Sequence, residues 1–526
     1  MTDQTEHIVI IGAGHNGLVC AAYLARAGKK VTVLEAAKQV GGAAITREFA
    51  PGFKVSAGAH LLYMLDKNVR RELSLDSAGL SFSQQNMKTT ALAEDGNHLA
   101  ISGDQLQGGG ISDKDCLAMK EYRRFMNRFA GVINRLNKRI PPRVATGNHS
   151  DWLSLAKVAL DIRLLGKNDM REFLRIAGIN IYDVLQENFE NPLLKGALSL
   201  DGVLGTNLGP RSNNSVFCAL HRLSGLQGIA MPKGGMGTVS NTLAQVAGKQ
   251  GAVIRTSASV SRILMNGDHV GGIELQNGEK ITAGTVISSA DPKTTFLRLL
   301  GARNLEAGFV RRVRNIRMRG NVAKLHLALD GVPEFKGLNQ NQLGNRLLIA
   351  PNLDYVENAF NQSKYGEYSV KPVAEIILPS LHDTSLAPPG KHVLSAVVQY
   401  APYQLKAGWS EKKAAYTDQV IDLLAGYAPG IHSRIVHKEM LTPVDIESEF
   451  LINGGHWHHG ELAMDQFLML RPVPHSAQYA SPVNGLFLCG AGSHPGGGVM
   501  GSAGRNAANA VLGAKNVGNN VGDRRS

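Results

Sequence analysis

The first forty residues change their hydrophobic period twice. Residues 7–11, "HIVII", form a short apolar run that predicts a buried strand. Residues 15–27 repeat apolar positions at helical spacing, and Gly28 follows where a helix-terminating glycine belongs. The next apolar run, "KKVTVLEA", predicts a second strand that ends at Glu35. The three segments together predict a complete strand–helix–strand unit of about 30 residues.

The pattern changes again after residue 110. Residues 110–225 contain several segments that each begin with polar residues and continue with apolar residues at helical spacing, which predicts a helical insertion. An α/β pattern returns at 231–300, where Asp291 and Pro292 predict a helix start. Strand-like runs between 320 and 400, such as "NVAKLHLAL", predict a second sheet, and 411–427 predict one helix. After residue 483 the order is strand, glycine-rich loop and helix.

Length and composition indicate a globular chain of several parts. The 526 residues suggest two or three domains, or one domain split by insertions. The sequence shows no signal peptide and no apolar run of about 18 residues. We therefore expect a cytoplasmic protein, or a mitochondrial matrix protein in a eukaryotic cell, with at most peripheral membrane contact. A homo-oligomer is compatible with this reading.

Charge and cysteine content narrow the function classes. The formal charge of +13 includes a basic run, Arg311–Gly320, that lacks interleaved aromatics and matches no nucleic-acid module. We expect a solvated face there, with a membrane-facing patch as the alternative, and no nucleic-acid partner. The four cysteines form no C-x-x-C and show no metal-ligand spacing. We therefore expect no disulfide framework, no redox dithiol, no metal site and a reducing compartment.

A G-x-G-x-x-G motif lies between the first predicted strand and helix. Gly12 allows the sharp turn, Gly14 leaves room for a pyrophosphate, and Gly17 lets helix and strand pack closely. The helix N-terminus offers free N–H groups to the phosphates. Glu35 can accept hydrogen bonds from ribose hydroxyls and would repel a 2′-phosphate, so NADP is disfavoured. The motif in this context predicts dinucleotide binding.

Two further glycine-rich segments favour FAD as that dinucleotide. "VGGAAITRE" follows Glu35 closely, with Gly41 and Gly42 allowing close approach and Thr46 supplying a hydroxyl. "LFLCGAGSHPGGGVMGSAGRNAA" at residues 486–508 predicts a strand, a glycine-rich turn and a helix that begins near Val499. That helix N-terminus would stabilise negative charge on a reduced flavin. A ligand with an adenine end and a flavin end would need both regions.

With "PGFKVSAGAHLL", "MPKGGMGTVSNTLA" and "VISSADPKTTF", these segments resemble the phytoene desaturase and carotenoid/retinoid oxidoreductase family. Within it they most resemble a group named for a pyridine nucleotide-disulfide oxidoreductase domain. The chain nevertheless lacks C-x-x-C and a second strand–GxGxxG–helix unit, so a two-nucleotide disulfide reductase is not favoured. The resemblance implies FAD contacts at these residues: Gly12, Ala13, Gly14, Asn16, Gly17, Glu35, Gly41, Gly42, Thr46, Val260, Gly490, Ala491, His494, Gly498, Val499 and Met500.

The expected fold class is α/β. A Rossmann-type, glutathione-reductase-like FAD-binding domain is assembled from discontinuous segments, and an α+β substrate domain carries the helical insertion. The expected division is FAD binding at 1–105, 230–300 and 461–515, a helical substrate- or membrane-facing insertion at 106–229, a mixed-sheet substrate domain at 301–460, and a disordered tail at 516–526.

Catalytic candidates are polar residues that the family pattern places near the flavin. They are His60, His456, His458 and Glu461. Each histidine could instead be a structural hydrogen-bonder, and the His456–His459 cluster lacks the pattern of a metal site.

The expected activity is FAD-dependent dehydrogenation of a hydrophobic, polyene- or lipid-like substrate. Hydride would pass to flavin N5, and O2 or a quinone would accept the electrons. Two alternatives remain open at this stage: an amine oxidase-like flavoenzyme using O2, and a flavoprotein with a binding or regulatory role. The amphipathic, basic stretch "WLSLAKVALDIRLLGK" could line an apolar channel, lie on a membrane or simply pack in the core.

Overall fold

The first predicted strand, β1, lies at the centre of a five-stranded parallel sheet. The structure, a computed structural model, describes residues 7–143 and 149–522. Ile8 of β1 pairs with Val31 of β2 on one side and with Thr285 of β14 on the other. In spatial order the strands are β10 (Val253–Arg255), β2 (Val31–Leu34), β1 (Ile8–Ile11), β14 (Thr285–Ser288) and β20 (Leu486–Leu488). The discontinuous α/β fold predicted from the sequence is confirmed.

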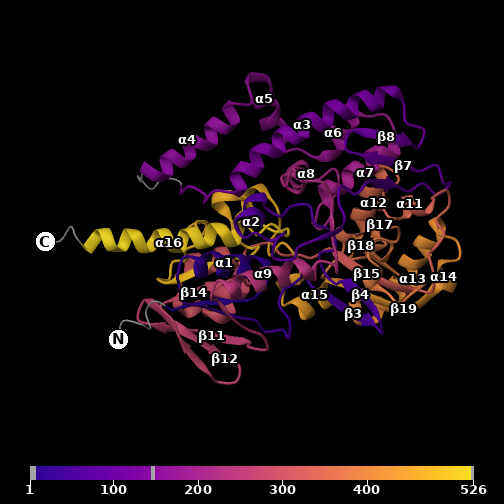
Figure 1. Ribbon diagram of the computed structural model, residues 1–526. Coiled ribbons are helices and arrows are strands. Elements are labelled where there is room, and N and C mark those ends of the chain that lie inside the picture. The colour runs from indigo at the N-terminus through magenta and orange to yellow at the C-terminus, as the bar shows by residue number, and fades with distance from the viewer. Residues whose placement is uncertain (1–6, 144–148, 523–526) are drawn as a thin grey trace.

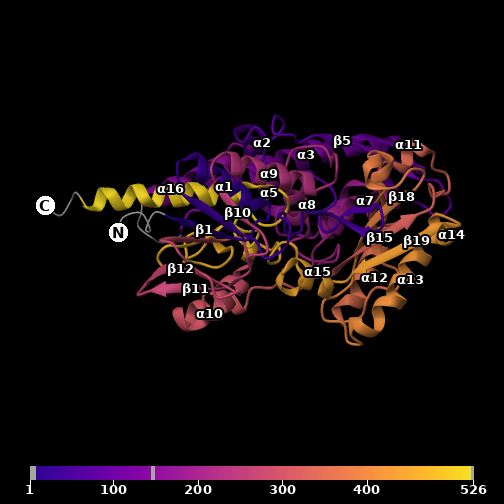
Figure 2. The same ribbon diagram turned by 60° about the horizontal axis from the view of Figure 1, so that its bottom comes forward.

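Both faces of this sheet are covered, which explains why its strands are apolar throughout. Ile8 and Ile10 pack in one cluster with α1, α9 and α16, whereas Val9 and Ile11 pack on the opposite side. That opposite side is covered by an antiparallel sheet and by α10 (Figures 1 and 2). The covering elements are α1 (His15–Arg26), α9 (Gly237–Lys249), α16 (Ser502–Gly522), α10 (Ala307–Arg314), β11 (Val260–Asn266), β12 (His269–Leu275) and β13 (Lys280–Thr282).

A second, eight-stranded sheet forms the other half of the molecule. In spatial order its strands are β19 (Ile435–Leu441), β15 (Val322–Leu329), β18 (His392–Gln399), β17 (Val373–Ile377), β16 (Arg346–Ile349), β6 (Thr89–Ala91), β7 (Leu99–Ser102) and β8 (Gln105–Gly108). Strands β6–β8 therefore pair with this sheet, although we grouped most of their residues with the first FAD segment. The helix predicted at 411–427 is confirmed as α13 (Trp409–Tyr427), which packs on one face.

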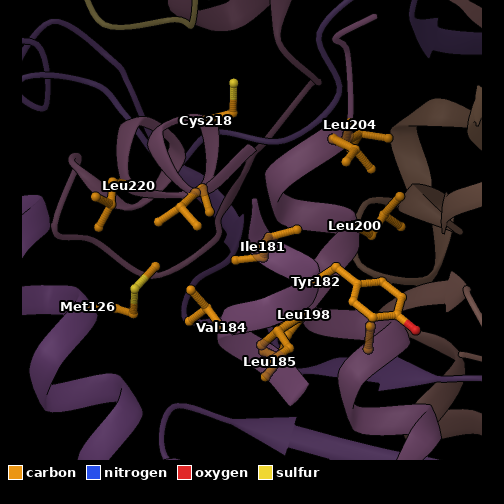
Figure 3. Close-up of a cluster of buried hydrophobic side chains, with 14 of the residues drawn as sticks. Met126, Ile181, Tyr182, Val184, Leu185, Leu198, Leu200, Leu204, Cys218 and Leu220 are labelled. Carbon is orange, nitrogen blue, oxygen red and sulfur yellow. The ribbon is translucent and has the colours of Figure 1, made fainter. Parts of the chain in front are cut away.

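The predicted helical insertion is a layer of helices over the other face of this sheet. Its apolar core joins Met126 of α3, Val184 and Leu185 of α6, Leu198 and Leu200 of α7, Leu204 directly after α7, and Leu220 of α8 (Figure 3). The helices of this layer are α3 (Asp113–Asn137), α4 (His149–Arg163), α5 (Lys167–Ile176), α6 (Ile181–Asn188), α7 (Pro192–Val203), α8 (Ser215–Leu223) and α12 (Leu353–Lys364).

Short elements connect these layers. They are α2 (Lys67–Glu72), α11 (Gln340–Leu343), α14 (Ile431–Arg434), α15 (Pro443–Phe450), β3 (Thr46–Ala50), β4 (Phe53–Ser56), β5 (Phe82–Gln84), β9 (Met231–Pro232) and the π-helical turn η1 (Thr294–Leu299). As predicted, Asp291 begins a helical segment: its Oδ1 accepts the Thr294 N–H at 3.0 Å.

The last helix is longer than the sequence predicted. Helix α16 extends to Gly522, into the stretch predicted as a disordered tail, and residues 523–526 lie outside the described part of the chain. Among the described residues, no helix has both the length and the apolar composition to cross a bilayer.

Candidate active site

A long cavity separates the two sheets. One end is formed by the loops that follow β1, β2 and β14, and the other end reaches Lys324, Glu375 and Val397 of the eight-stranded sheet. Ligands of open parallel sheets bind at these carboxyl ends of strands. The predicted cofactor residues that line the cavity are Gly12, Gly14, Asn16, Glu35, Gly41, Gly42, Val260, Ala491, Gly498 and Val499.

The first glycine loop has the geometry of a phosphate cradle. Gly14 caps α1 without a side-chain bond, and the first turn of α1 carries no acidic residue. A Cβ on Gly17 would lie 2.2 Å from the Gly12 carbonyl oxygen, so Gly17 serves packing and does not line the cavity. Asn16 Oδ1 and His15 Nε2 are buried without a hydrogen-bond partner in the described structure. The loop thus presents unpaired polar atoms at a helix N-terminus, where a pyrophosphate fits.

Glu35 is held in place by the backbone. Its two carboxylate oxygens accept the N–H groups of Ala13, at 2.7 Å, and Ala37, at 2.9 Å. Ala13 therefore contributes through Glu35 and not as part of the cavity wall. Each carboxylate oxygen keeps further lone pairs for a ribose hydroxyl.

The second glycine pair closes over the first loop. Gly41 donates its N–H to the Ala13 carbonyl at 2.9 Å, and a Cβ on Gly42 would lie 3.5 Å from Gly14 Cα. Thr46 lies away from the cavity. Its hydroxyl donates to the Gly234 carbonyl at 2.9 Å and accepts the Gly237 N–H at 2.9 Å, so it positions the start of α9.

The carboxyl-terminal glycine loop completes the same wall. Ala491, Gly498 and Val499 line the cavity, and α16 begins three residues beyond Val499, at Ser502. The other predicted members of this loop lie outside the lining. Gly490 packs against Ser289, the Met500 carbonyl accepts the Asp66 N–H at 3.0 Å, and the buried His494 bonds the Leu136 carbonyl at 3.0 Å.

At the far end of the cavity, three residues form a row across the eight-stranded sheet. The strand registers place Lys324 of β15 opposite Val397 of β18, and Val397 opposite Glu375 of β17. All three side chains line the cavity, together with Tyr63, Arg222 and the predicted His60. A charged patch therefore faces the cavity from an otherwise apolar sheet.

Glu375 is the centre of a buried ion-pair network. It accepts hydrogen bonds from His60 Nε2 at 2.9 Å, from Arg222 at 2.9 Å and from Arg346. Burial alone would raise the pKa of Glu375, but Arg346 and Arg222 hold it well below its usual range. Burial lowers the pKa of His60 to about 4, so this imidazole is neutral and donates from Nε2.

Lys324 is the unpaired member of this patch. Its side chain is 1% exposed, and its ammonium has no hydrogen-bond partner in the described structure. Burial lowers the pKa of Lys324 to about 7, and the nearby Glu375 offsets only part of this effect. Arg222 and Arg346 already balance Glu375 and Asp201. A protonated Lys324 therefore leaves one uncompensated positive charge at this end of the cavity.

The histidines of the 456–459 cluster differ in whether they line the cavity. His458 and the neighbouring His459 line the cavity, whereas His456 is buried beside them without reaching it. Burial lowers the pKa of His456 to about 3 and that of His458 well below its usual range. These rings are therefore neutral at neutral pH, and within the described structure both ring nitrogens of His456 and Nδ1 of His458 are buried without a hydrogen-bond partner. His458 also packs against Gly497, where an added Cβ would lie 2.1 Å from His458 Nδ1.

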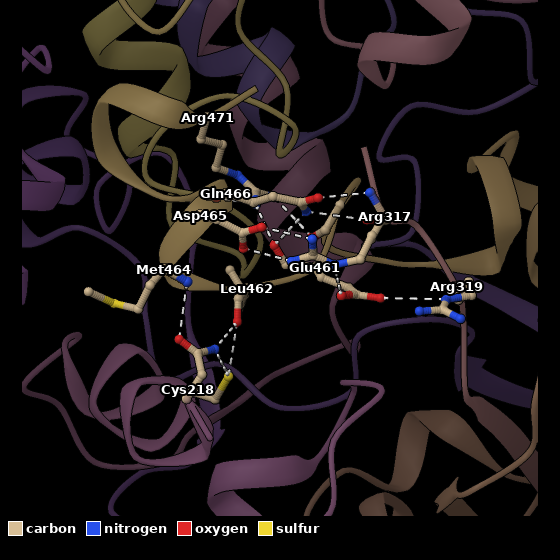
Figure 4. A network of polar contacts seen from close by, with 11 residues as sticks. Cys218, Arg317, Arg319, Glu461, Leu462, Met464, Asp465, Gln466 and Arg471 are labelled. Atoms are coloured by element: carbon tan, nitrogen blue, oxygen red, sulfur yellow. Dashed lines mark hydrogen bonds and ion pairs between the residues drawn. The ribbon is translucent and has the colours of Figure 1, made fainter. Parts of the chain in front are cut away.

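Glu461, our fourth catalytic candidate, lies outside the cavity lining. Its carboxylate pairs with Arg317 at 2.8 Å and with Arg319 at 4.0 Å (Figure 4). The fully buried Arg471 holds this segment by donating to backbone carbonyls, including those of His458 and Glu461. The segment supports the cavity wall that His458 and His459 line.

Several lining residues were missed from the sequence: Tyr63, Arg222, Ser289, Arg298, Lys324, Glu375 and Trp457. For Lys324 a signal was present. The run "NVAKLHLAL" alternates so that Lys324 and His326 share one face of a strand that reads as buried, and buried charges mark functional sites.

These features fit an elongated dinucleotide. Four features meet along one cavity. They are glycines with no room for a Cβ, the free N-terminus of α1, the Glu35 carboxylate positioned for a ribose, and a second glycine loop. The fold and the site define the class: this is an FAD-dependent oxidoreductase.

The chain belongs to the flavin containing amine oxidoreductase family, which matches residues 17–512. It is 36% identical to pyridine nucleotide-disulfide oxidoreductase domain-containing protein 2 of Rattus norvegicus, over 96% of this chain and 93% of the relative. One of the limonene dehydrogenase subunits of Castellaniella defragrans is 28% identical, over 98% and 95% of the two chains. Phytoene desaturase (lycopene-forming) of Pantoea ananas is 25% identical, over 96% and 98%. The resemblance read from the motifs is confirmed, with phytoene desaturases as more distant relatives.

Solved structures support the same fold. An oxidoreductase from Methanosarcina mazei has a TM-score of 0.59 at 18% identity, covering 96% of this chain and 99% of that chain. Wild-type putrescine oxidase bound to putrescine has a TM-score of 0.57 at 15% identity, covering 96% and 98%.

The name of the rat relative contains the word "disulfide", but the described residues of this chain contain no accessible pair of thiols. Cys20 and Cys489 do lie together, but both are fully buried. The hydrogen bond of the Cys20 thiol to Cys489 and burial raise the pKa of Cys20 well above its usual range, the opposite of an activated cysteine.

Proposed function

We propose that this protein dehydrogenates a predominantly apolar substrate. The observation that carries the proposal is the continuity of the cavity from the dinucleotide loops into a chamber walled by apolar side chains. These are Leu61, Met64, Leu204, Val397, Ile446, Phe450, Leu451, Ile452 and Trp457. Such a wall excludes water from the reacting carbon. Two of the relatives are named for limonene and phytoene, which are hydrocarbons.

The charge at the end of the chamber argues against an amine oxidase. Lys324 is unpaired there, and Arg222 lies in the same wall. A substrate ammonium in this region would meet the charge of protonated Lys324 with no free carboxylate to balance it, because Glu375 is already shared by two guanidinium groups. A neutral substrate carries no such cost.

Dehydrogenation of a C–C bond releases a hydride and a proton. The loops at Gly12–Asn16 and Gly498–Val499 would hold FAD, which would supply the hydride acceptor, with O2 or a quinone as the final electron acceptor. For the proton, Lys324 is the best-matched side chain of the chamber, because its pKa of about 7 leaves much of it neutral at neutral pH. His60 and His458 are poorer bases, since burial lowers their pKa values further.

The test is anaerobic titration of the purified holoprotein, followed by the absorbance of oxidised flavin. The substrates are limonene, phytoene, a long-chain fatty acid and putrescine. We expect bleaching by one or more of the apolar compounds and none by putrescine. Bleaching by putrescine alone would contradict the proposal in favour of an amine oxidase. An unchanged spectrum with every compound would favour the binding or regulatory alternative.

A matched pair of variants tests the role of Lys324. Lys324→Met should slow bleaching by an active substrate and remove its dependence on pH near 7, whereas the exposed Lys371→Met should change neither. An unaltered pH profile in Lys324→Met would exclude Lys324 as the proton acceptor. Admitting O2 or a soluble quinone after bleaching then identifies the electron acceptor by the rate at which colour returns.

A further inference from the structure

The helices α4 and α5 carry an unusual concentration of exposed apolar side chains. Trp152, Leu153, Leu164 and Leu174 are each more than 60% exposed, and Leu160 is 54% exposed. Outside the helical layer, Tyr365 is the one large hydrophobic side chain of the described residues exposed to that extent. Figure 1 shows α4 and α5 at the outer edge of the molecule, beyond α3. Isolated exposed leucines are ordinary, but a contiguous apolar patch marks an interaction surface.

The exposed positions follow the helical repeat. Leu153, Lys157, Leu160 and Leu164 succeed one another at intervals of four, three and four residues, so they share one face of α4. This surface, with Trp152, Arg163, Lys167, Arg171 and Leu174, is called the α4–α5 face below. The inner side of the same helices is anchored by Asp161 and Phe173, which are buried. Both sides of the helices are therefore used, one for packing and one for exposure.

Charge is segregated on this face. Lys157, Arg163, Lys167 and Arg171 are exposed, and in the described part of the chain none of them forms an ion pair. The acidic residues of the same segment are engaged elsewhere. Asp161 pairs with Arg135 at 2.8 Å and with Arg139 at 2.6 Å, Asp169 pairs with Arg128, and Glu172 pairs with Arg175. The face thus presents positive charge around an apolar stripe.

We infer that the α4–α5 face docks on an anionic lipid surface. Leucine and tryptophan side chains enter the boundary between headgroups and acyl chains, while lysine and arginine remain at the anionic headgroups. A second copy of this chain is a poorer occupant. A two-fold contact would bring the four unpaired basic side chains of one copy against those of the other.

The docking surface is separate from the apolar chamber. The exposed Leu451, directly after α15, is one of the residues that line that chamber. In both Figures 1 and 2, α5 lies above α15. No residue of α4 or α5 belongs to the cavity lining in the described part of the chain. Docking anchors the protein and leaves its cavity unaltered. Variants of the face should therefore keep the flavin spectrum and any turnover of a dissolved substrate.

The experiment is co-sedimentation of the holoprotein with vesicles of phosphatidylcholine alone, or mixed with phosphatidylserine. The wild type should sediment with the mixed vesicles and be released by high salt. Two variants remove the two contributions: Trp152→Ser/Leu153→Ser/Leu160→Ser/Leu164→Ser, and Lys157→Glu/Lys167→Glu/Arg171→Glu. Each should weaken binding at least about tenfold, since every basic residue near an anionic surface contributes measurably. The matched control, Tyr365→Ser/Val370→Ser, changes side chains that are 70% and 57% exposed elsewhere and should bind as the wild type.

Tryptophan fluorescence gives an independent readout. Trp409 is buried and Trp457 lies in the cavity wall, so a blue shift on adding mixed vesicles should disappear in Trp152→Phe. The inference is overturned if the wild type stays in the supernatant, or if the face variants sediment like the control. It is also overturned if the apolar variant instead converts a dimer to a monomer, which would make a second copy the occupant.

Discussion

Replacing the buried Lys324 by methionine should stabilise the folded protein, and more strongly at neutral pH than in alkali. Methionine has a similar length and carries no charge, and the lysine ammonium has no partner to lose in the described structure. Burial lowers the pKa of Lys324 from its ordinary value of 10.5 to about 7. Between these values the unfolded chain binds more protons than the folded one. The stability of the wild type therefore rises with pH across this window.

The magnitude follows from the same two pKa values. A tenfold change in proton affinity corresponds to about 1.4 kcal/mol, so the lysine costs the fold about 4 kcal/mol near pH 7 and about 2 kcal/mol near pH 9. Lys324→Met removes this cost. Its advantage over the wild type should shrink by about 2 kcal/mol between these two pH values.

The assay is thermal unfolding of wild type, Lys324→Met and the exposed control Lys371→Met, followed by circular dichroism at both pH values. The control should track the wild type throughout. An advantage of Lys324→Met that is equal at both pH values would refute the reasoning, because it would show that the lysine is not held partly neutral. A lower melting temperature of Lys324→Met at neutral pH would refute it as well.

Three other substitutions test the remaining parts of the site. Gly17→Ala should yield protein with little bound flavin, because the new Cβ would lie 2.2 Å from the Gly12 carbonyl oxygen. Gly248→Ala, whose Cβ would meet nothing within 4 Å, should keep its yellow colour. Equal flavin content in the two variants would contradict the cradle geometry. Glu375→Gln should destabilise the fold by about 3–5 kcal/mol, because Arg222 and Arg346 lose the carboxylate that they share. The control substitution at the exposed Glu367, Glu367→Gln, should not destabilise it. Equal melting temperatures of the two variants would argue against the ion-pair network. Glu461→Gln should lower the melting temperature and leave the flavin spectrum and the bleaching rate unchanged. A large loss of bleaching rate would instead indicate that Glu461 is a catalytic residue.

The sequence predicted those parts of the fold and site that depend on neighbouring residues. Gly12, Gly14, Asn16 and Glu35 lie within one strand–helix–strand unit, so their roles follow from local geometry. The apolar strands of both sheets and the helical insertion were likewise readable from their periods.

The substrate end was not readable in this way, because it depends on the pairing of distant segments. His60 meets Glu375, a residue 315 positions away, and the Lys324–Val397–Glu375 row exists only in the register of three strands. The position of Glu461 depends on a distant segment in the same way. Its sequence neighbours suggested the active site, whereas its ion-pair partner, Arg317, is 144 residues away and Glu461 is not among the residues that line the cavity.

The central claim is that the glycine-rich segments near both ends of the chain bind a single FAD. Crystals of the holoprotein test it most directly. The account predicts one FAD, with its pyrophosphate at the N–H groups of Gly14–Asn16 and its flavin ring beside Gly498 and Val499. Density for a flavin ring that lies away from Gly498 and Val499, or a folded protein that leaves this cavity without FAD, would contradict it.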